Sequence, residues 1–174
     1  FMIYTNGTLI DREVAKKIYE VGNISPAISL EGGKEATDWR RGKGTYDKVM
    51  AAMDNLKEYK VPFGVSLTVT RRNYEELFTD EFIDMVISKG AFYGWAFHYI
   101  PIGLKPDFSL MLTPEQRVAM IDRIREIRTT KPILLADFWN DGEFTGGCIA
   151  GGRRYFHINA SGDVEPCAFV HFAV

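Results

Sequence analysis

Short apolar segments with the character of strands alternate with longer segments of helical periodicity over the first 137 residues. Strands are predicted over residues 1–7, 24–33, 62–70, 91–103 and 132–138. Strands that are apolar on both faces and separated by helices pair in parallel, with the helices packed against the sheet. Five strands are too few to close an eight-stranded (β/α) barrel. The alternation therefore predicts an α/β fold, built as an incomplete (β/α) barrel or an open parallel sheet with covering helices.

Capping residues mark the expected ends of the helices between these strands. Asp11 is placed to cap the first helix and Gly22 to end it, and Thr45 is the expected N-cap of the second. The segment ISPAISLEGG is predicted to be a strand that runs into a loop at its glycines. The helix after the fourth strand begins at Thr113, where a capping Thr, Pro114 in the first turn and a Gln three residues on agree.

Composition excludes several classes of partner. The net charge is −2 and no segment is rich in Lys and Arg, so neither a nucleic acid nor an anionic membrane is an expected partner. No apolar run approaches the roughly 20 residues that span a bilayer. The two cysteines do not form the framework of a secreted disulfide-rich domain. A reducing, cytoplasmic setting is therefore expected.

Polar and glycine-rich groups follow the predicted strands. They are Thr5–Gly7, Ser29 with Glu31–Gly33, Thr68 and Thr70 with Asn73, and Tyr99 with Pro101 and Gly103. Any one of them suits an ordinary strand-to-helix turn. Four at the C-terminal edge of one parallel sheet, where ligands bind in such folds, favour a ligand site.

Both cysteines lie in a small irregular module that begins at about residue 138. Cys148 and Cys167 are spaced as Cys-x13-Gly-x4-Cys, and YFHIN, ASGD and VEPC predict a hairpin that brings Cys167 back towards Cys148. The pair can be two buried apolar residues, a disulfide, part of a zinc site with His157 or His171, or part of an iron–sulfur cluster.

Two functions fit these residues without reference to any known family. One is a stand-alone, non-catalytic binding domain with a structural zinc site. The other is a (β/α)-barrel hydrolase that uses Glu31 or Asp137 as acid and base, although carboxylates at strand ends are common in such folds. The aromatic residues at 92, 93, 95, 97 and 99 are expected to pack within the sheet rather than to line a pocket.

These motifs resemble the radical S-adenosylmethionine (SAM) enzymes that carry a C-terminal SPASM or twitch extension. Cys-x13-Gly-x4-Cys is similar to the opening of that extension, where a hairpin carries the first ligands of an auxiliary [4Fe–4S] cluster. The fourth barrel strand of the family and its following helix resemble Ser29-x-Glu31-Gly32, Asp38, Arg41-Gly42 and Gly44-x-Tyr46. The resemblance covers essentially the whole chain. It implies a partial radical SAM barrel over residues 1–137 and the start of a SPASM/twitch-like module over 138–174.

The resemblance also implies roles for individual residues. Ser29 and Arg41 would hold the carboxylate and ribose region of SAM, with Glu31 at the same strand end, where the family usually has Asp. The adenosine would be bordered by Asn6, Tyr99 and Pro101. Cys148 and Cys167 would ligate the auxiliary cluster. No residue is predicted to act directly in catalysis.

The activity implied is radical hydrogen abstraction from a small-molecule or peptide substrate, with electrons from a donor such as flavodoxin or ferredoxin. The family's Cys-x3-Cys-x2-Cys is absent, and so is the Gly-Gly-Glu that follows the second strand of the family's barrel. Glu31-Gly32-Gly33 does not replace it, because it follows the strand that resembles the fourth strand of that barrel. The chain is therefore expected to be the C-terminal part of a longer enzyme, inactive alone in SAM cleavage. Ala168 stands where some peptide-oxidising members have an acid.

Overall fold

The computed structural model describes residues 1–150, 153–170 and 172–173. Five parallel strands form one sheet in chain order: β1 (Met2–Thr5), β2 (Ser25–Leu30), β3 (Gly64–Val69), β4 (Tyr93–His98) and β5 (Leu134–Asp137). The helices between and after them are α1 (Arg12–Val21), α2 (Lys34–Arg41), α3 (Thr45–Glu58), α4 (Tyr74–Leu77), α5 (Asp80–Ser88) and α6 (Pro114–Thr130). A 3₁₀ helix over Phe108–Leu110 precedes α6. The predicted alternation is confirmed.

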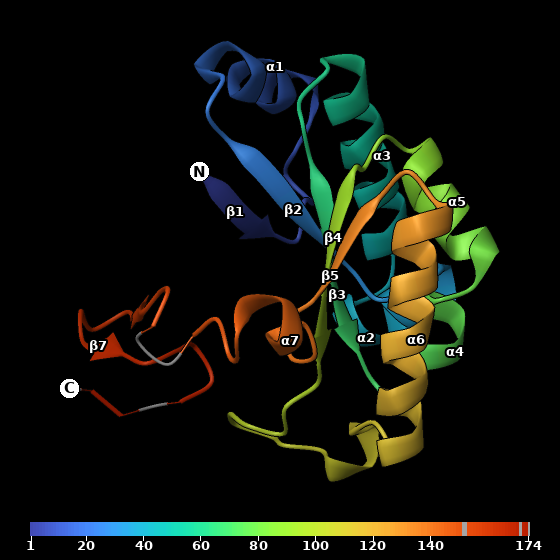
Figure 1. Ribbon diagram of the computed structural model, residues 1–174. Helices are drawn as coiled ribbons and strands as arrows, with labels where there is room; N and C mark the ends of the chain where they lie inside the picture. The colour runs from blue at the N-terminus through green and yellow to red at the C-terminus, as the bar shows by residue number, and fades with distance from the viewer. Residues whose placement is uncertain (151–152, 171, 174) are drawn as a thin grey trace.

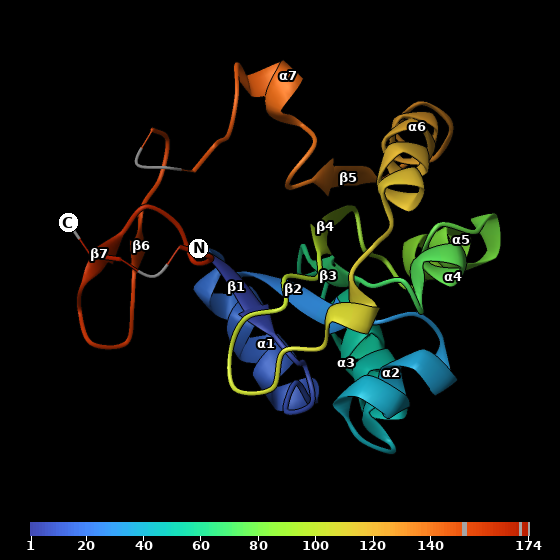
Figure 2. The same ribbon diagram turned by 90° about the horizontal axis from the view of Figure 1, so that it is seen from below.

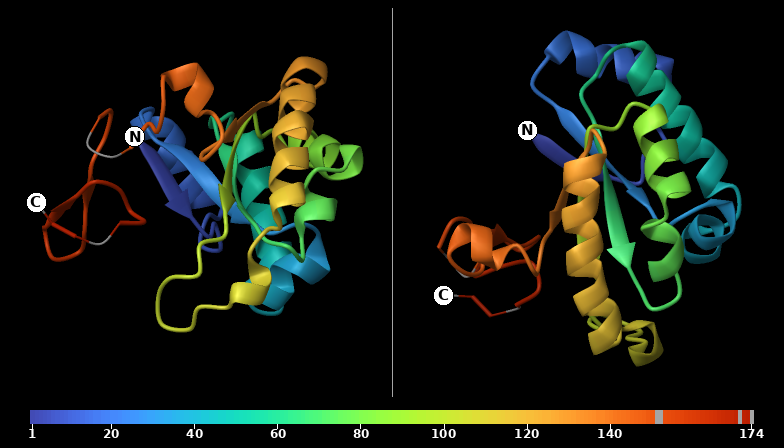
Figure 3. Two further views of the ribbon diagram at one scale, coloured as in Figure 1. Left: turned by 60° about the horizontal axis from the view of Figure 1, so that its bottom comes forward. Right: turned by 45° about the vertical axis from the view of Figure 1, so that its right-hand side comes forward.

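The sheet is curved, with its two faces covered differently. The helices lie on the convex side, and the C-terminal segment, with α7 (Gly142–Thr145), β6 (His157–Ile158) and β7 (Val164–Glu165), lies on the concave side (Figures 1 and 2). The convex side holds the apolar core, in which side chains such as Leu30, Leu67 and Leu135 are fully buried. This arrangement confirms the incomplete (β/α) barrel, and among the described residues the only helix on the concave side is the short α7 (Figure 3).

Two of the expected helix starts are confirmed in atomic detail. Asp11 accepts a hydrogen bond from the Val14 backbone N–H at 2.8 Å, and Gly22 ends α1 with a positive φ of 73°. At the start of α6, Thr113 and Gln116 form the complete reciprocal capping box.

The predicted cap at Thr45 is wrong. Gly44 is the N-cap of α3, and Thr45 is its first residue, with a hydroxyl that donates to the carbonyl of Arg41. The capping carboxylate comes from Asp38, which accepts from the backbone N–H groups of Gly44 at 2.9 Å and Tyr46 at 2.8 Å. Helix α2 was not predicted from the sequence.

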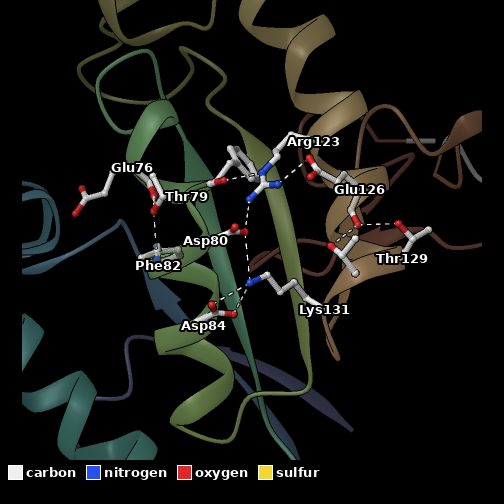
Figure 4. Close-up of polar contacts among 11 residues, drawn as sticks. Glu76, Thr79, Asp80, Phe82, Asp84, Arg123, Glu126, Thr129 and Lys131 are labelled. Carbon is white, nitrogen blue, oxygen red and sulfur yellow. Dashed lines mark hydrogen bonds and ion pairs between the residues drawn. The ribbon is translucent and has the colours of Figure 1, made fainter.

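An ion-pair network joins α5 to α6 on the convex side (Figure 4). Arg123 contacts Asp80 and Glu126, each at 2.7 Å, and its Nε donates to the carbonyl of Phe78. Lys131 contacts Asp84 at 2.8 Å and Asp80 at 3.4 Å. These contacts hold α6 against α5.

The predicted hairpin is present. Strands β6 and β7 are antiparallel, with His157 opposite Glu165, and Gly162 in the turn has a φ of 91°, which a residue with a side chain rarely adopts. The boundary at residue 138 between two units stays a prediction. No helix in the described part of the chain is long and apolar enough to cross a bilayer.

Candidate functional site

Strands β2 and β3 present small side chains on the concave face, whereas β4 presents large aromatic ones. Ser29, Ser66 and Trp95 lie side by side on the three strands, and Thr68 lies beside Phe97 one pleat further along. Neighbours in a parallel ladder point to the same face, and the alternate residues are those buried under the helices. The concave face is thus divided into a strip of hydroxyl groups and a wall of rings.

An open cavity of about 800 Å³, here called the concave cavity, lies between this face and the C-terminal segment. Rings from both sides line it: Tyr4, Trp95, Phe97, Tyr99, Phe138, Tyr155 and Phe169. Its polar lining comes from Ser66, Thr68, His98, His157 and Arg40. A mostly apolar hollow with a few convergent polar groups is the usual form of a small-molecule site.

The aromatic residues of β4 divide between packing and the cavity. Trp95, Phe97 and Tyr99 line the concave cavity, where the expectation of packing within the sheet is wrong. Phe92 is exposed on the surface. The Tyr93 ring is buried and lies across Gly64, with its hydroxyl donating to the carbonyl of Pro26 at 3.1 Å.

Tyr4, Tyr99 and Tyr155, from distant parts of the chain, line this cavity. Burial raises the pKa of Tyr4 to about 12, with further contributions from the charges of Tyr93 and Tyr155. Tyr99 accepts a hydrogen bond at its hydroxyl oxygen from the Asp107 N–H, 3.1 Å away, which ties it to the loop before α6. Pro101 lies in the same loop but does not line the concave cavity.

A second hollow of about 570 Å³, here called the cationic cleft, lies beside the end of β1. It is lined by Asn6, Thr8, Arg40, Arg41, Thr45 and Lys48. Three cations and no acid face this space, which suits an anionic group. Arg40 lines both hollows.

Glu31 is the centre of the polar cluster at the end of β2. Its carboxylate is 1% exposed, and its Oε1 accepts from Arg41 Nε at 2.8 Å and lies 3.3 Å from Arg40 Nη1. Oε2 has no hydrogen-bond partner within the described ranges. Burial raises the pKa of this carboxyl, and the charges of Arg40 and Arg41 oppose the shift.

The backbone around Glu31 is held by neighbouring elements. Asn73 Nδ2 donates to the Glu31 carbonyl at 2.8 Å and to the Thr68 carbonyl at 3.0 Å, and so joins the ends of β2 and β3. At the start of α2, Glu76 accepts from the Gly33 N–H. Three predicted residues therefore meet here: Glu31 contacts Arg41 directly, and Asn6 shares the cationic cleft with Arg41. Ser29 is half-buried nearby and lines neither hollow.

Cys148 and Cys167 lie on the concave side, next to the same tyrosine. Cys148 is exposed, Cys167 is buried, and neither forms a disulfide. Burial raises the pKa of Tyr155, and the charges of Cys167 and Cys148 raise it further, so both thiols lie near its hydroxyl. No group of three Cys, His, Asp or Glu side chains that could hold a metal ion occurs among the residues with described positions. His171 lies outside the described residues.

A buried histidine, expected from the sequence to be structural rather than a ligand, lies at the end of β4. His98 Nε2 lies 3.4 Å from Asn140 Nδ2 and 3.7 Å from Asp137 Oδ1 at the end of β5. Burial lowers the pKa of His98 to about 4, Asp137 opposes the shift and Arg117 adds to it. The ring is therefore neutral near pH 7. Its position at a strand end next to Asp137 is the signal that could have identified it.

The sequence is similar to that of one known protein family. Residues 1–83 match the family model of the Radical SAM superfamily. The chain is 40% identical over 77 residues to Fe-coproporphyrin III synthase of Methanosarcina barkeri, a match that covers 44% of this chain and 19% of that protein. It is 32% identical over 177 residues to mycofactocin maturase MftC of Mycolicibacterium smegmatis, covering 95% of this chain and 44% of that protein. Over its first 83 residues the chain is similar to the radical SAM superfamily.

The fold of this chain is shared with a solved structure. Native anSMEcpe with bound AdoMet and Cp18Cys peptide superimposes with a TM-score of 0.73 at 21% identity, over 98% of this chain and 52% of that one. The chain thus spans about half or less of the length of the proteins it matches. Similarity to a superfamily of enzymes that use SAM and a [4Fe–4S] cluster favours the radical SAM prediction over the zinc-domain and hydrolase alternatives.

Proposed function

We propose that this chain forms the SAM- and substrate-facing part of a longer radical SAM enzyme, and that its last residues begin a SPASM- or twitch-type module. The observation that carries this proposal is the pair of hollows at the strand ends. A cationic cleft and an aromatic cavity lie next to each other and share Arg40. One suits the charged end of SAM, and the other suits the substrate.

The residues of the cationic cleft fit SAM. Arg41 is 23% exposed and uses Nε and Nη2 on Glu31, while its Nη1 has no partner in the described chain and can donate to a carboxylate. Asn6 on one side of the cleft and Ser29 at the end of β2 offer polar groups for the ribose region. Tyr99 and Pro101, in the loop after β4, would border the adenosine.

The cysteines fit part of a cluster. A [4Fe–4S] cluster is commonly held by four thiolates, and Cys148 and Cys167 would supply two of them near Tyr155. The remaining ligands would come from elsewhere in the protein.

When bound, SAM and a reduced [4Fe–4S] cluster supply the radical chemistry that removes a hydrogen from the substrate. The chain's own residues would bind and orient the substrate against the rings of the concave cavity and keep water from it. A peptide or small-molecule substrate is proposed, since anSMEcpe was solved with a peptide and a matching relative is a porphyrin synthase by name. A flavodoxin or ferredoxin as electron donor and a cytoplasmic setting complete the proposal.

Titration calorimetry with S-adenosylhomocysteine tests the cofactor site. We expect the Arg41→Gln variant to bind at least about tenfold more weakly than the wild type, because a hydrogen bond to a charged group contributes on the order of 1.5–3 kcal/mol. Arg12→Gln is the matched control, since Arg12 pairs with Glu58 on the surface. Equal affinity in the Arg41 variant and the wild type would contradict the assignment.

Anaerobic reconstitution with iron and sulfide tests the cluster. The full-length protein is expected to take up iron and to show the broad visible absorption of an iron–sulfur cluster, and Cys148→Ala and Cys167→Ala are each expected to lower its iron content. A colourless protein that binds one zinc ion would favour the zinc-domain alternative.

A further inference from the structure

We infer that the concave cavity binds a substrate group that is flat and aromatic and carries a carboxylate or carbonyl oxygen. The inference rests on the proposed function and specifies the class of substrate that it requires. Two independent features of the cavity lining, its shape and its charge, support the inference.

The ring wall sets the shape of the ligand. Trp95 and Phe97 are nearly parallel, with an interplanar angle of 18° and centroids 6.1 Å apart, and they form a stacked pair along β4. Phe138 meets Phe97 at 4.9 Å, and Phe169 of the C-terminal segment lies 5.9 Å from Phe138 and 6.4 Å from Phe97. Aromatic rings pack best against such surfaces in offset-stacked or edge-to-face arrangements. A planar ring therefore gains more in this cavity than an aliphatic chain of the same size.

Next to the rings, the same concave face offers hydrogen-bond donors. The hydroxyl groups of Ser66 and Thr68 line it and have no side-chain partner elsewhere in the described chain. Asn140 Nδ2 is a donor, so His98 Nε2 accepts and the neutral ring carries its proton on Nδ1. Arg40 contacts Glu31 only through Nη1, at 3.3 Å, and its other nitrogens remain available.

The charge of the lining selects the polar group of the ligand. No Asp or Glu is among the residues that line the concave cavity, whereas Arg40 is. An ammonium group would meet a guanidinium and several N–H or O–H donors there without an acid to balance it. A carboxylate or carbonyl oxygen would instead accept from Arg40, Ser66 or Thr68. The rings and the hydrogen-bond donors of the cavity lining together favour an aromatic acid or an aromatic carbonyl compound as the ligand.

Two sources supply this chemistry: a free aromatic acid, and an aromatic residue with its carboxylate at the end of a peptide. Fluorine NMR titrations of the full chain distinguish them, with 4-fluorobenzoate as the free acid. A short peptide that ends in 4-fluorophenylalanine, with a free or an amidated C-terminus, is the second probe. Tighter binding of the free-carboxylate peptide than of 4-fluorobenzoate identifies a peptide end, and the reverse order identifies a free acid.

Matched probes and variants test ring and charge separately. We expect 4-fluorobenzylammonium and 4-fluorocyclohexanecarboxylate each to bind at least about tenfold more weakly than 4-fluorobenzoate. Trp95→Leu and Arg40→Gln are each expected to weaken 4-fluorobenzoate about tenfold. The control is Trp39→Leu, because Trp39 lies on the surface under Arg72, 3.9 Å from the guanidinium carbon to the ring centre. Melting temperatures of all variants show that each one folds.

Equal binding of the ammonium and carboxylate probes overturns the inference, as does unchanged affinity in folded Trp95→Leu. Addition of S-adenosylhomocysteine separates it from the proposed function. Complete displacement of 4-fluorobenzoate assigns the cavity to the cofactor, so the inference fails and the proposed function stands. Binding of 4-fluorobenzoate by a chain that takes no S-adenosylhomocysteine leaves the inference standing on shape and charge, while the proposed function fails.

Discussion

Two donors of Arg41, Nε and Nη2, converge on a single oxygen of Glu31, lying 2.8 and 2.5 Å from Oε1. This contact fixes the guanidinium at the end of β2 and turns its remaining edge towards the cationic cleft. Arg41 is thereby positioned by a buried acid before any ligand binds, which reduces the side-chain entropy that binding would cost.

Replacing Glu31 by Gln is expected to destabilise the protein by about 2 kcal/mol, because the charge-assisted hydrogen bonds of two arginines are lost. Urea unfolding measures the change. Glu58→Gln, which removes an exposed partner of Arg12, is the control and should cost under about 1 kcal/mol. Similar effects of the two substitutions would show that the Glu31 cluster does not stabilise the fold.

Asp38, rather than Thr45, is expected to control the start of α3. Asp38→Ala removes the acceptor of the Gly44 and Tyr46 N–H groups and should lower the melting temperature by several degrees. Thr45→Ala removes one hydroxyl that donates to a carbonyl and should change it little. A larger effect at Thr45 than at Asp38 would restore the cap expected from the sequence.

His98 gives folding stability a defined dependence on pH. Its pKa is about 4 in the folded protein against a usual 6.5, so between these values the unfolded chain binds a proton that the folded chain does not. Stability is therefore fully present above pH 6.5 and falls as the pH drops towards 4, by up to about 1.4 kcal/mol per pH unit.

Urea midpoints between pH 4 and 7 measure this dependence in the wild type and in His98→Gln, where the contribution should disappear. His157→Gln is the control, because His157 is partly exposed in the hairpin. An unchanged slope in His98→Gln would show that His98 is not the group responsible.

Gly64 is expected to tolerate no side chain. A Cβ at this position would lie 2.4 Å from ring atoms of Tyr93 and 2.5 Å from its carbonyl oxygen. Gly64→Ala should cost about 1–3 kcal/mol through overpacking. Ser66→Ala, two residues along the same strand on the same face, should be nearly neutral. Thermal unfolding compares the two, and equal melting temperatures would mean that Tyr93 moves aside freely.

The sequence predicted those elements whose burial follows one period. Strands β2 to β4 are buried on alternate or successive positions, and Asp11 caps α1 within three residues, so local patterns were sufficient. Helix α2 has only Thr37 buried and is otherwise polar, so no apolar periodicity marks it. Asp38 caps α3 across the turn at Gly42 and Gly44, whose positive φ angles bring the chain back on itself. The spacing of residues along the sequence does not indicate that the chain turns back and brings Asp38 to the start of α3.

The positions of the candidate site residues follow the same division between local and long-range patterns. Strand ends in a parallel sheet meet at one edge, so Glu31, Arg41, Asn6 and Tyr99 could be placed near one another from the sequence. Arg40 could not, because neighbouring residues on a helix point in different directions, and only the position of α2 brings both arginines to Glu31. The cavity lining from Phe169 depends on the return of the C-terminal segment over the concave face, which no local pattern shows.

Arg40 lines both hollows, and one guanidinium can donate fully to only one ligand at a time. A ligand that draws Arg40 into the cationic cleft takes a donor away from the concave cavity, and the reverse also holds. The two binding equilibria are then linked through one side chain, and such linkage is reciprocal by thermodynamic necessity. Whichever ligand binds first would lower the affinity for the other by the same factor, without any change in the fold.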